Sequence, residues 1–246
     1  MEESGSPMSN YKKTIIVTGG SGRFGVKLKE IRTKYLIFFP EKKELDIIKY
    51  KSIFKYLKEK KPKIVIHMAA LSRPMDEHYK NLEKSIDINI VGTCNVVKAC
   101  KKLNIKLVYF STSYVYPGTR GNYKETDPVL PKNNYSWSKL GGECAVQMYN
   151  NSLILRICMT EKPFVHKKAF CDFITNFIYH DDIAKILFKI IHLKGIINLG
   201  GKTQSVYKFV KKDNPSIKKS FAKKILGKNY PLNPSMNISK LKKILK

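Results

Sequence analysis

The sequence contains no uninterrupted apolar run near the roughly 18 residues that a membrane-spanning helix requires. Its N-terminus also lacks the charged and then apolar layout of a secretory signal peptide. Both absences predict a soluble, cytoplasmic protein with no membrane partner. Residues 1–10 are mostly polar and are interpreted as a disordered or artificially added tail.

Cysteine is sparse and shows no paired spacing. The chain has an odd number of cysteines without any Cys-x-x-Cys motif, mostly among apolar neighbours: Cys94, Cys100, Cys144, Cys158 and Cys171. A disulfide framework or a zinc site normally shows regular pairs. The sequence therefore predicts buried free thiols and no metal site.

Arginine is scarce although the chain is strongly basic. The net charge of +28 would attract polyanions, but five of the 47 basic residues are Arg. Arg is the side chain that reads phosphate and guanine with two hydrogen bonds, and the Lys residues are scattered instead of forming one stripe. We expect no specific nucleic-acid partner. The stretch from Lys202 onward, with 13 Lys against the single acid Asp213, is interpreted as a solvated basic end.

Internal repeats and low-complexity linkers are also absent, so 246 residues with 43% hydrophobic content fit one domain. Short apolar runs alternate with longer amphipathic stretches, which is the pattern of strand–helix units around a parallel sheet. Strands are predicted at 14–18, 35–39, 64–68, 106–110 and 152–157, and a long helix at 82–103. The fold class is α/β, a doubly wound parallel sheet whose ligands bind beyond the carboxyl ends of the strands.

A glycine-rich loop follows the first predicted strand. Gly19, Gly22 and Gly25 are three residues apart, and a helix begins directly after them. Such glycines let the chain turn, let backbone N–H groups approach a pyrophosphate and let the helix pack on the sheet. The loop predicts a dinucleotide-binding site.

Tyr135 and Lys139 have the spacing of one helical turn, which suits proton transfer to a carbonyl. Tyr56 with Lys60 and Tyr207 with Lys211 show the same interval, so the interval alone is uninformative. The hydroxyl cluster that begins at Ser111 follows a predicted strand 24 residues before Tyr135. A tyrosine with an ordinary pKa of about 10 needs a neighbouring cation to act near neutral pH, and Lys139 is expected to supply it.

The glycine spacing and the Tyr/Lys pair resemble the short-chain dehydrogenase/reductases, which have a Rossmann fold. The resemblance implies that Thr112 orients a carbonyl, Tyr135 protonates it and Lys139 tunes Tyr135 and binds the nicotinamide ribose, with Ser113 the alternative to Thr112. The residues implied to contact the cofactor are Gly19, Ser21, Gly22, Arg23, Phe24, Gly25, Lys42, Lys43, Asp46, Ile47, Ala69, Ala70, Leu71, Asn89, Tyr135 and Lys139. Asn89 is implied to support a proton relay, or else to bridge the helix backbone.

The end of the second predicted strand bears on the choice of cofactor. An acid there suits the ribose 2′-hydroxyl of NAD, whereas cations suit the 2′-phosphate of NADP. Lys42 and Lys43 favour NADP(H), and Glu41 keeps NAD(H) open.

Longer segments resemble the dTDP-4-dehydrorhamnose reductases: 111–118, 123–128, 134–143, 153–156 and 231–241. The resemblance implies NADPH-dependent reduction of the C4 ketone of a nucleotide-linked 4-keto-6-deoxyhexose, with substrate contacts from Arg73, Ser113 and Tyr114. A homodimer is left open.

The sequence also departs from this family. Tyr114 stands where relatives that also epimerise the sugar carry Cys, whereas Ser72 to Asp76 resembles plant-type epimerase/reductases. A bifunctional 3,5-epimerase/4-reductase, a 4-epimerase and a silent NADP-binding regulatory subunit remain alternatives. The segment after Arg156 is short, so we expect a cofactor domain over 11–160 and a reduced substrate lobe over 161–246. His166 and His180 are interpreted as structural, His180 at a helix start beside Asp181.

Overall fold

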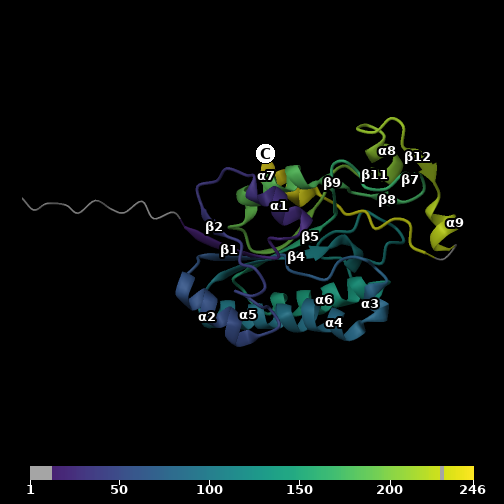
Figure 1. Ribbon diagram of the computed structural model, residues 1–246. Helices are drawn as coiled ribbons and strands as arrows, with labels where there is room; N and C mark the ends of the chain where they lie inside the picture. The colour runs from purple at the N-terminus through teal and green to yellow at the C-terminus, as the bar shows by residue number, and fades with distance from the viewer. Residues whose placement is uncertain (1–12, 228–229) are drawn as a thin grey trace, which may run out of the picture.

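A six-stranded parallel sheet forms the centre of the protein, seen in a computed structural model that describes residues 13–227 and 230–246 (Figure 1). The strands lie in the order β10-β5-β4-β3-β1-β2 and all run parallel. Their bounds are Thr14–Thr18 (β1), Leu36–Phe38 (β2), Ile64–His67 (β3), Lys106–Thr112 (β4), Ser152–Ile157 (β5) and Gly195–Leu199 (β10). The predicted doubly wound α/β sheet is confirmed. The tail predicted at 1–10 lies outside the described residues.

Helices cover both faces of the sheet (Figure 1). The lower layer in the figure contains α2 (Tyr50–Lys60), α3 (Glu77–Lys80), α4 (Leu82–Ile86), α5 (Gly92–Lys102) and α6 (Asn134–Gln147). The opposite layer contains α1 (Arg23–Lys29), α7 (His180–Ile190) and α10 (Ser239–Leu245). Because successive strand residues point to opposite faces, Ile15 packs in the cluster with α1 and α7 while Ile16 packs in the cluster with α2 and α5. Burial on both faces explains the continuous apolar runs.

The strand predictions agree with the structure except at the end of β4. The runs at 14–18 and 152–157 are strands with those bounds, and β2 and β3 are slightly shorter than predicted. Strand β4 continues past Phe110 because Ser111 and Thr112 pair with Arg156 and Ile157 of β5. The sheet therefore carries two hydroxyl side chains to its carboxyl edge.

The long helix predicted over 82–103 is interrupted by a π-helical turn, η1 (Asp87–Val91), between α4 and α5. The Gly92 N–H donates to the Asp87 carbonyl, five residues back, which accommodates one extra residue in the turn. Helix α6 packs closely here: a Cβ on Gly142 would lie 2.6 Å from the Asn89 carbonyl oxygen. The sequence pattern predicted the combined length of α4, η1 and α5. It did not predict the π-helical turn against which α6 packs.

The remaining elements lie mostly beyond the edge of the sheet, on the right in Figure 1. They are η2 (Ser113–Val115), β6 (Met159–Thr160), β7 (Lys168–Phe170), β8 (Ile174–Thr175), β9 (Ile178–Tyr179), β11 (Gln204–Ser205), α8 (Val206–Val210), β12 (Lys218–Ser220) and α9 (Ala222–Leu226). Three two-stranded pairs, β6 with β9, β7 with β12 and β8 with β11, join them. A separate apolar cluster around Phe173, Val206 and Ile217 holds this part together.

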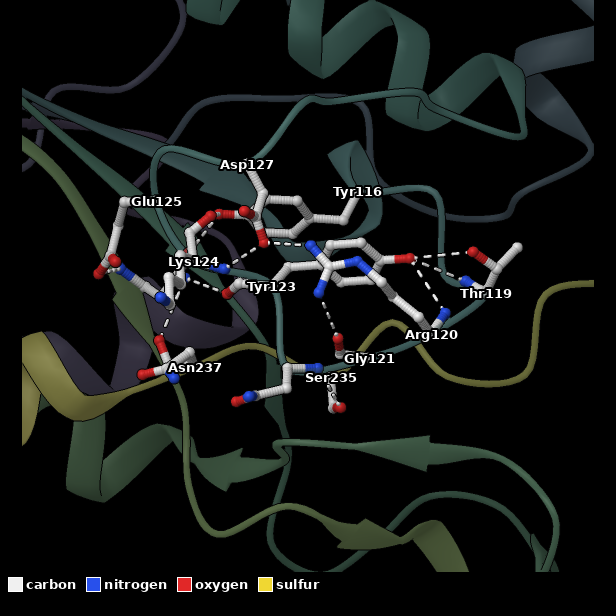
Figure 2. Close-up of polar contacts among 12 residues, drawn as sticks. Tyr116, Thr119, Arg120, Gly121, Tyr123, Lys124, Glu125, Asp127, Ser235 and Asn237 are labelled. Atoms are coloured by element: carbon white, nitrogen blue, oxygen red, sulfur yellow. Dashed lines mark hydrogen bonds and ion pairs between the residues drawn. The ribbon is translucent and has the colours of Figure 1, made fainter.

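The loop between η2 and α6 is fastened to the C-terminal segment through Tyr123 (Figure 2). The Tyr123 N–H donates to the Ser235 carbonyl at 3.0 Å, and the Asn237 N–H donates to the Tyr123 carbonyl at 2.8 Å. The ring of Tyr123 stacks on the ring of Tyr116 with centroids 5.0 Å apart. The Arg120 guanidinium lies 4.7 Å from the centroid of the Tyr123 ring and forms an ion pair with Asp127. The loop between η2 and α6 is therefore held in place by residues near the C-terminal end of the sequence.

A buried ion pair joins α6 to the sheet. Arg156 of β5 donates to the Glu143 carboxylate at 2.7 Å, and the two side chains are 3% and 0% exposed. The Ser111 hydroxyl of β4 donates to the other carboxylate oxygen of Glu143. Arg156 also donates to the Tyr116 hydroxyl at 2.8 Å. Glu143 thus fixes the position of α6 relative to the carboxyl ends of β4 and β5.

The cysteines are free, as predicted, but their predicted burial holds only in part. Cys100 and Cys158 are buried, Cys94 and Cys171 are half-buried, and Cys144 is exposed because it lies on the outer face of α6. Across residues 13–227 and 230–246, no helix has the length and apolar character needed to span a bilayer.

Replacing Glu143 by Gln should lower the free energy of unfolding by about 3 kcal/mol, because Arg156 is then buried without its counter-ion. Urea unfolding followed by circular dichroism measures the change. Glu59→Gln is the matched control, since the Glu59–Lys60 pair lies at the surface and its loss should leave the free energy of unfolding nearly unchanged. Equal unfolding free energies for the two variants would contradict a structural role for Glu143.

Candidate active site

A pocket of about 660 Å³ opens at the carboxyl edge of the sheet. Strand β1 lies between β2 and β3 in the sheet. The chain therefore passes from β1 to β2 on one side and then crosses back to form β3 on the other side of β1. In doubly wound sheets the ligand crevice forms at this reversal of strand order. The pocket lies there, between the loops after β1, β3 and β4 and the start of α6.

The glycine loop forms one wall of the pocket. Gly19 has φ of +76°, and a Cβ there would lie 2.6 Å from the backbone nitrogen of Ala69. A side chain is therefore excluded both by conformation and by the approach of the chain after β3. The Gly22 N–H donates to the Gly19 carbonyl at 3.0 Å, which closes the turn that leads into α1.

Most of the residues predicted from the sequence line this pocket. They are Gly19, Ser21, Gly22, Arg23, Phe24, Gly25, Lys42, Asp46, Ile47, Ala69, Ala70, Arg73, Thr112, Ser113, Tyr114, Tyr135 and Lys139. Lys43, Leu71 and Asn89 do not line it. Lys43 is 79% exposed and pairs with Glu41 at 3.0 Å.

Asn89 acts here as a bridge between backbone segments. Its side-chain amide exchanges two hydrogen bonds with the backbone of Leu71, at 2.8 and 2.9 Å, and donates to the Ser138 hydroxyl at 2.8 Å. Ser138 in turn donates to the Tyr135 carbonyl at 2.7 Å. The amide therefore ties the loop after β3 to the first turn of α6.

Thr112, Tyr135 and Lys139 converge on the same wall of the pocket from two elements. Thr112 ends β4, and Tyr135 lies in the first turn of α6 with Lys139 one turn later. Burial raises the pKa of Tyr135, while the Thr112 hydroxyl and the positive charge of Arg73 oppose the rise. Arg73 is thus a second cation near Tyr135, in addition to Lys139 one helical turn along α6.

Lys139 is itself strongly perturbed. It is 3% exposed, and its Nζ lies 4.2 Å from the centroid of the Tyr109 ring. Burial lowers the pKa of Lys139 to about 7, against the opposing attraction of the Glu143 carboxylate. In the two other Tyr/Lys pairs with this spacing, the Lys Nζ lies over the Tyr ring, 5.9 Å from the centroid for Lys60 on Tyr56 and 5.4 Å for Lys211 on Tyr207.

A buried histidine lies behind the pocket. The Thr18 hydroxyl contacts His67 Nδ1 at 2.7 Å, and His67 Nε2 contacts the Thr93 hydroxyl at 3.1 Å. Thr93 donates its own proton to the Asn89 carbonyl, so it accepts from Nε2 and Thr18 donates to Nδ1. Burial and the charge of Lys139 lower the pKa of His67 to about 3. His67 is therefore a neutral link between β1, β3 and the π-helical turn.

Three residues that the sequence did not place at the site lie in or beside it. The ring of His78, 0% exposed, packs 5.3 Å from the ring of Tyr135. Glu161 lines the pocket and accepts hydrogen bonds from Arg23 and Arg73. His180 begins α7 as expected, but it also lines the pocket and packs edge-on against Phe24 at 5.6 Å. These contacts join segments that are distant in the chain, so no local pattern could reveal them.

Comparison with known proteins gives one family for most of the chain. Residues 13–192 match the RmlD substrate binding domain. The dTDP-4-dehydrorhamnose reductase of Aggregatibacter actinomycetemcomitans is 28% identical over 151 residues, which cover 59% of this chain and 51% of the relative. Methionine adenosyltransferase 2 subunit beta of Pongo abelii is 29% identical over 119 residues, 48% of this chain and 35% of the relative. The chain thus spans about half the length, or less, of these curated relatives.

A solved structure is similar over nearly all of the fold. The dTDP-4-dehydrorhamnose reductase of Bacillus anthracis, in complex with NADP, superposes with a TM-score of 0.84 at 27% identity. The match covers 94% of this chain and 92% of that structure.

The lowered pKa of Lys139 should make stability depend on pH. The folded protein releases this proton above pH of about 7, whereas the unfolded chain keeps it up to the ordinary pKa of 10.5. The wild type should therefore gain stability relative to Lys139→Met as the pH rises from 7 towards 10, by up to about 1.4 kcal/mol per pH unit. Below pH 7 the difference should be constant.

Urea unfolding at pH 6, 7.5 and 9 measures this difference. Lys102→Met, at an exposed position on α5, is the control and should give a difference that does not change with pH. A flat difference for Lys139→Met over the same range would contradict the burial of a titrating amine at this position.

Proposed function

The chain belongs to the RmlD substrate binding domain family, and from this premise we propose that it is an NADPH-dependent reductase of the C4 ketone of a nucleotide-linked 4-keto-6-deoxyhexose. The observation that supports this most directly is the meeting of Thr112, Tyr135 and Lys139 at one wall of a pocket that begins at a glycine loop. The activity named for the relative from Aggregatibacter supports the same reaction.

The proposed cofactor is NADP(H), with NAD(H) as the alternative. A Cβ on Gly22 would meet only the Gly19 carbonyl oxygen, at 3.2 Å, so the surface of the loop is free for the approach of a pyrophosphate. Lys42 lines the pocket beside Asp46 and suits the 2′-phosphate of NADP. The structure from Bacillus anthracis, which is in complex with NADP, supports this choice.

In the proposed mechanism, bound NADPH supplies the hydride. The hydroxyl groups of Thr112 and Tyr135 hold the ketone oxygen between them, and Tyr135 gives it a proton as negative charge develops. A positioned general acid of this kind contributes roughly 10² to 10⁴ in rate. Lys139, with its pKa near neutrality, supplies positive charge one turn below Tyr135 and returns a proton toward it afterwards.

We propose that residues 11–160 bind the cofactor and that 161–246 form a reduced lobe that binds the sugar nucleotide. Tyr114, Phe177 and Tyr230 line the part of the pocket nearest this lobe and offer flat faces to a sugar ring. Arg73 and Ser113 offer hydrogen bonds beside them. The base of the nucleotide and the identity of the sugar are left open, with dTDP and UDP sugars as the candidates.

A second candidate function is that of an NADP-binding subunit of another enzyme. The similarity to a subunit of methionine adenosyltransferase over 119 residues favours it. The retained set of Thr112, Tyr135 and Lys139 favours catalysis instead, because a binding subunit has no use for a buried general acid and amine.

We also propose a homodimer formed through α4 and α6, which lie side by side. Leu82 and Ile86 of α4 are 52% and 39% exposed, Trp137 of α6 is 49% exposed, and Met148, which directly follows α6, is 87% exposed. Light scattering should give twice the chain mass for the wild type and the chain mass for Trp137→Glu. Phe221→Glu, at an equally exposed aromatic residue near α9, should stay dimeric. A monomeric wild type would contradict this interface.

The reductase proposal is tested by following NADPH absorbance with dTDP- or UDP-4-keto-6-deoxyglucose, with and without a separate 3,5-epimerase. Tyr135→Phe should lower kcat by roughly 10² to 10⁴ and leave the Kd for NADPH within about twofold, because the ring stays and only the acid is lost. Tyr56→Phe is the matched control, since Tyr56 also precedes a lysine by one turn but lies on α2, and it should keep full activity.

Failure of the wild type to consume NADPH with either sugar would overturn the reductase proposal. Full activity of Tyr135→Phe would overturn the role of Tyr135 alone. NAD that copurifies with the protein and is not exchanged during turnover would favour a 4-epimerase.

A further inference from the structure

Glu161 connects two loops across the pocket. It follows β6, and its Oε1 accepts a hydrogen bond from Arg23 Nη1 at 2.5 Å and from Arg73 Nη1 at 3.1 Å. Arg23 begins α1 after the glycine loop, and Arg73 belongs to the loop after β3. The two guanidinium groups therefore meet at a single oxygen atom, close enough together for one phosphate group to contact both.

The Glu161 carboxylate has hydrogen-bond partners at only one of its two oxygens among the residues that the structure describes. Glu161 is 15% exposed, and its second oxygen, Oε2, is buried without a hydrogen-bond partner among the residues that the structure describes. Burial raises the pKa of Glu161, but its own backbone N–H, Arg73 and Arg23 together lower it, so the group is ionised. A buried, unpaired carboxylate oxygen is unfavourable, and it regains hydrogen bonds if the side chain moves into water.

The two arginines suit a different anion. Their side chains are 52% and 43% exposed, and both line the pocket together with the glycine loop. Guanidinium groups bind phosphate oxygens with short, charge-assisted hydrogen bonds. A diphosphate carries more charge and more acceptor oxygens than one carboxylate, so it is the better partner for this pair.

We propose that Arg23 and Arg73 form a diphosphate-binding site that Glu161 occupies as an internal substitute in the ligand-free protein, and from which the ligand displaces it. This inference rests on the proposed function, because both the dinucleotide and the sugar nucleotide of that reaction bring a diphosphate. Glu161 then acts as a competitor that weakens binding and speeds release, which suits an enzyme that exchanges its cofactor in every turnover.

The signs of three substitutions distinguish this site from an ordinary structural ion pair. Glu161→Gln removes the competing charge and frees both arginines, so it should tighten diphosphate binding by about tenfold. Arg23→Gln and Arg73→Gln each remove a charge-assisted contact and should weaken binding by about tenfold or more. Glu30→Gln is the control, because Glu30 pairs with Lys27 at 3.1 Å on α1 outside the pocket and should leave the Kd unchanged.

Binding is measured with NADPH by fluorescence, and with dTDP, UDP and inorganic pyrophosphate by calorimetry. Tighter NADPH binding by Glu161→Gln with unchanged dTDP and UDP binding would assign the site to the cofactor, and the reverse would assign it to the sugar nucleotide. Unchanged or weaker binding of all four probes by Glu161→Gln would overturn the proposal. None of these readouts needs turnover, so a wild type that binds the probes but reduces no ketone would remove the proposed reaction and leave this test intact.

Discussion

The buried carboxylate of Glu143 is the constraint on which the candidate site depends. It receives Ser111 from the end of β4 and Arg156 from β5, and it lies one helical turn after Lys139 on α6. Thr112 is the next residue along β4 from Ser111. The separation between the hydroxyl on the sheet and the Tyr/Lys pair on the helix is therefore set by one ion pair, Glu143 with Arg156, which does not line the candidate pocket. Its low exposure also keeps the field of Glu143 strong enough to act on Lys139.

A second constraint fixes the tilt of the same helix. The π-helical turn at η1 directs the Asn89 carbonyl toward α6, where Gly142 leaves room for it. The side chain of Asn89 meanwhile fastens Leu71 and Ser138. Asn89 thus contacts α6 at two positions, through its carbonyl at Gly142 and through its side chain at Ser138. The two contacts together hold the helix more firmly than either would alone. The π-helical turn lies where α6 meets the loop after β3.

Much of the fold was predictable because it follows local rules. Strands buried on both faces read as short apolar runs, and the glycine loop stands directly after the first of them. The polar end of β4 was not predicted, because the burial of Ser111 and Thr112 depends on their pairing with β5. A run of Ser and Thr does not have the apolar pattern of a buried strand. At the site, Thr112, Tyr135 and Lys139 could be selected through the resemblance to the short-chain dehydrogenase/reductases. Glu161 could not, since it meets Arg23 across 138 positions of sequence.

The electrostatics of Tyr135 bear on the direction of the proposed reaction. Burial raises its pKa, so at neutral pH the phenol is protonated before any ligand binds. A reductase needs an acid in that state, because hydride transfer leaves negative charge on the ketone oxygen that only a proton donor can relieve. An epimerase begins by oxidising its substrate and needs the phenolate instead, which a raised pKa disfavours. A protonated Tyr135 therefore suits the proposed reduction.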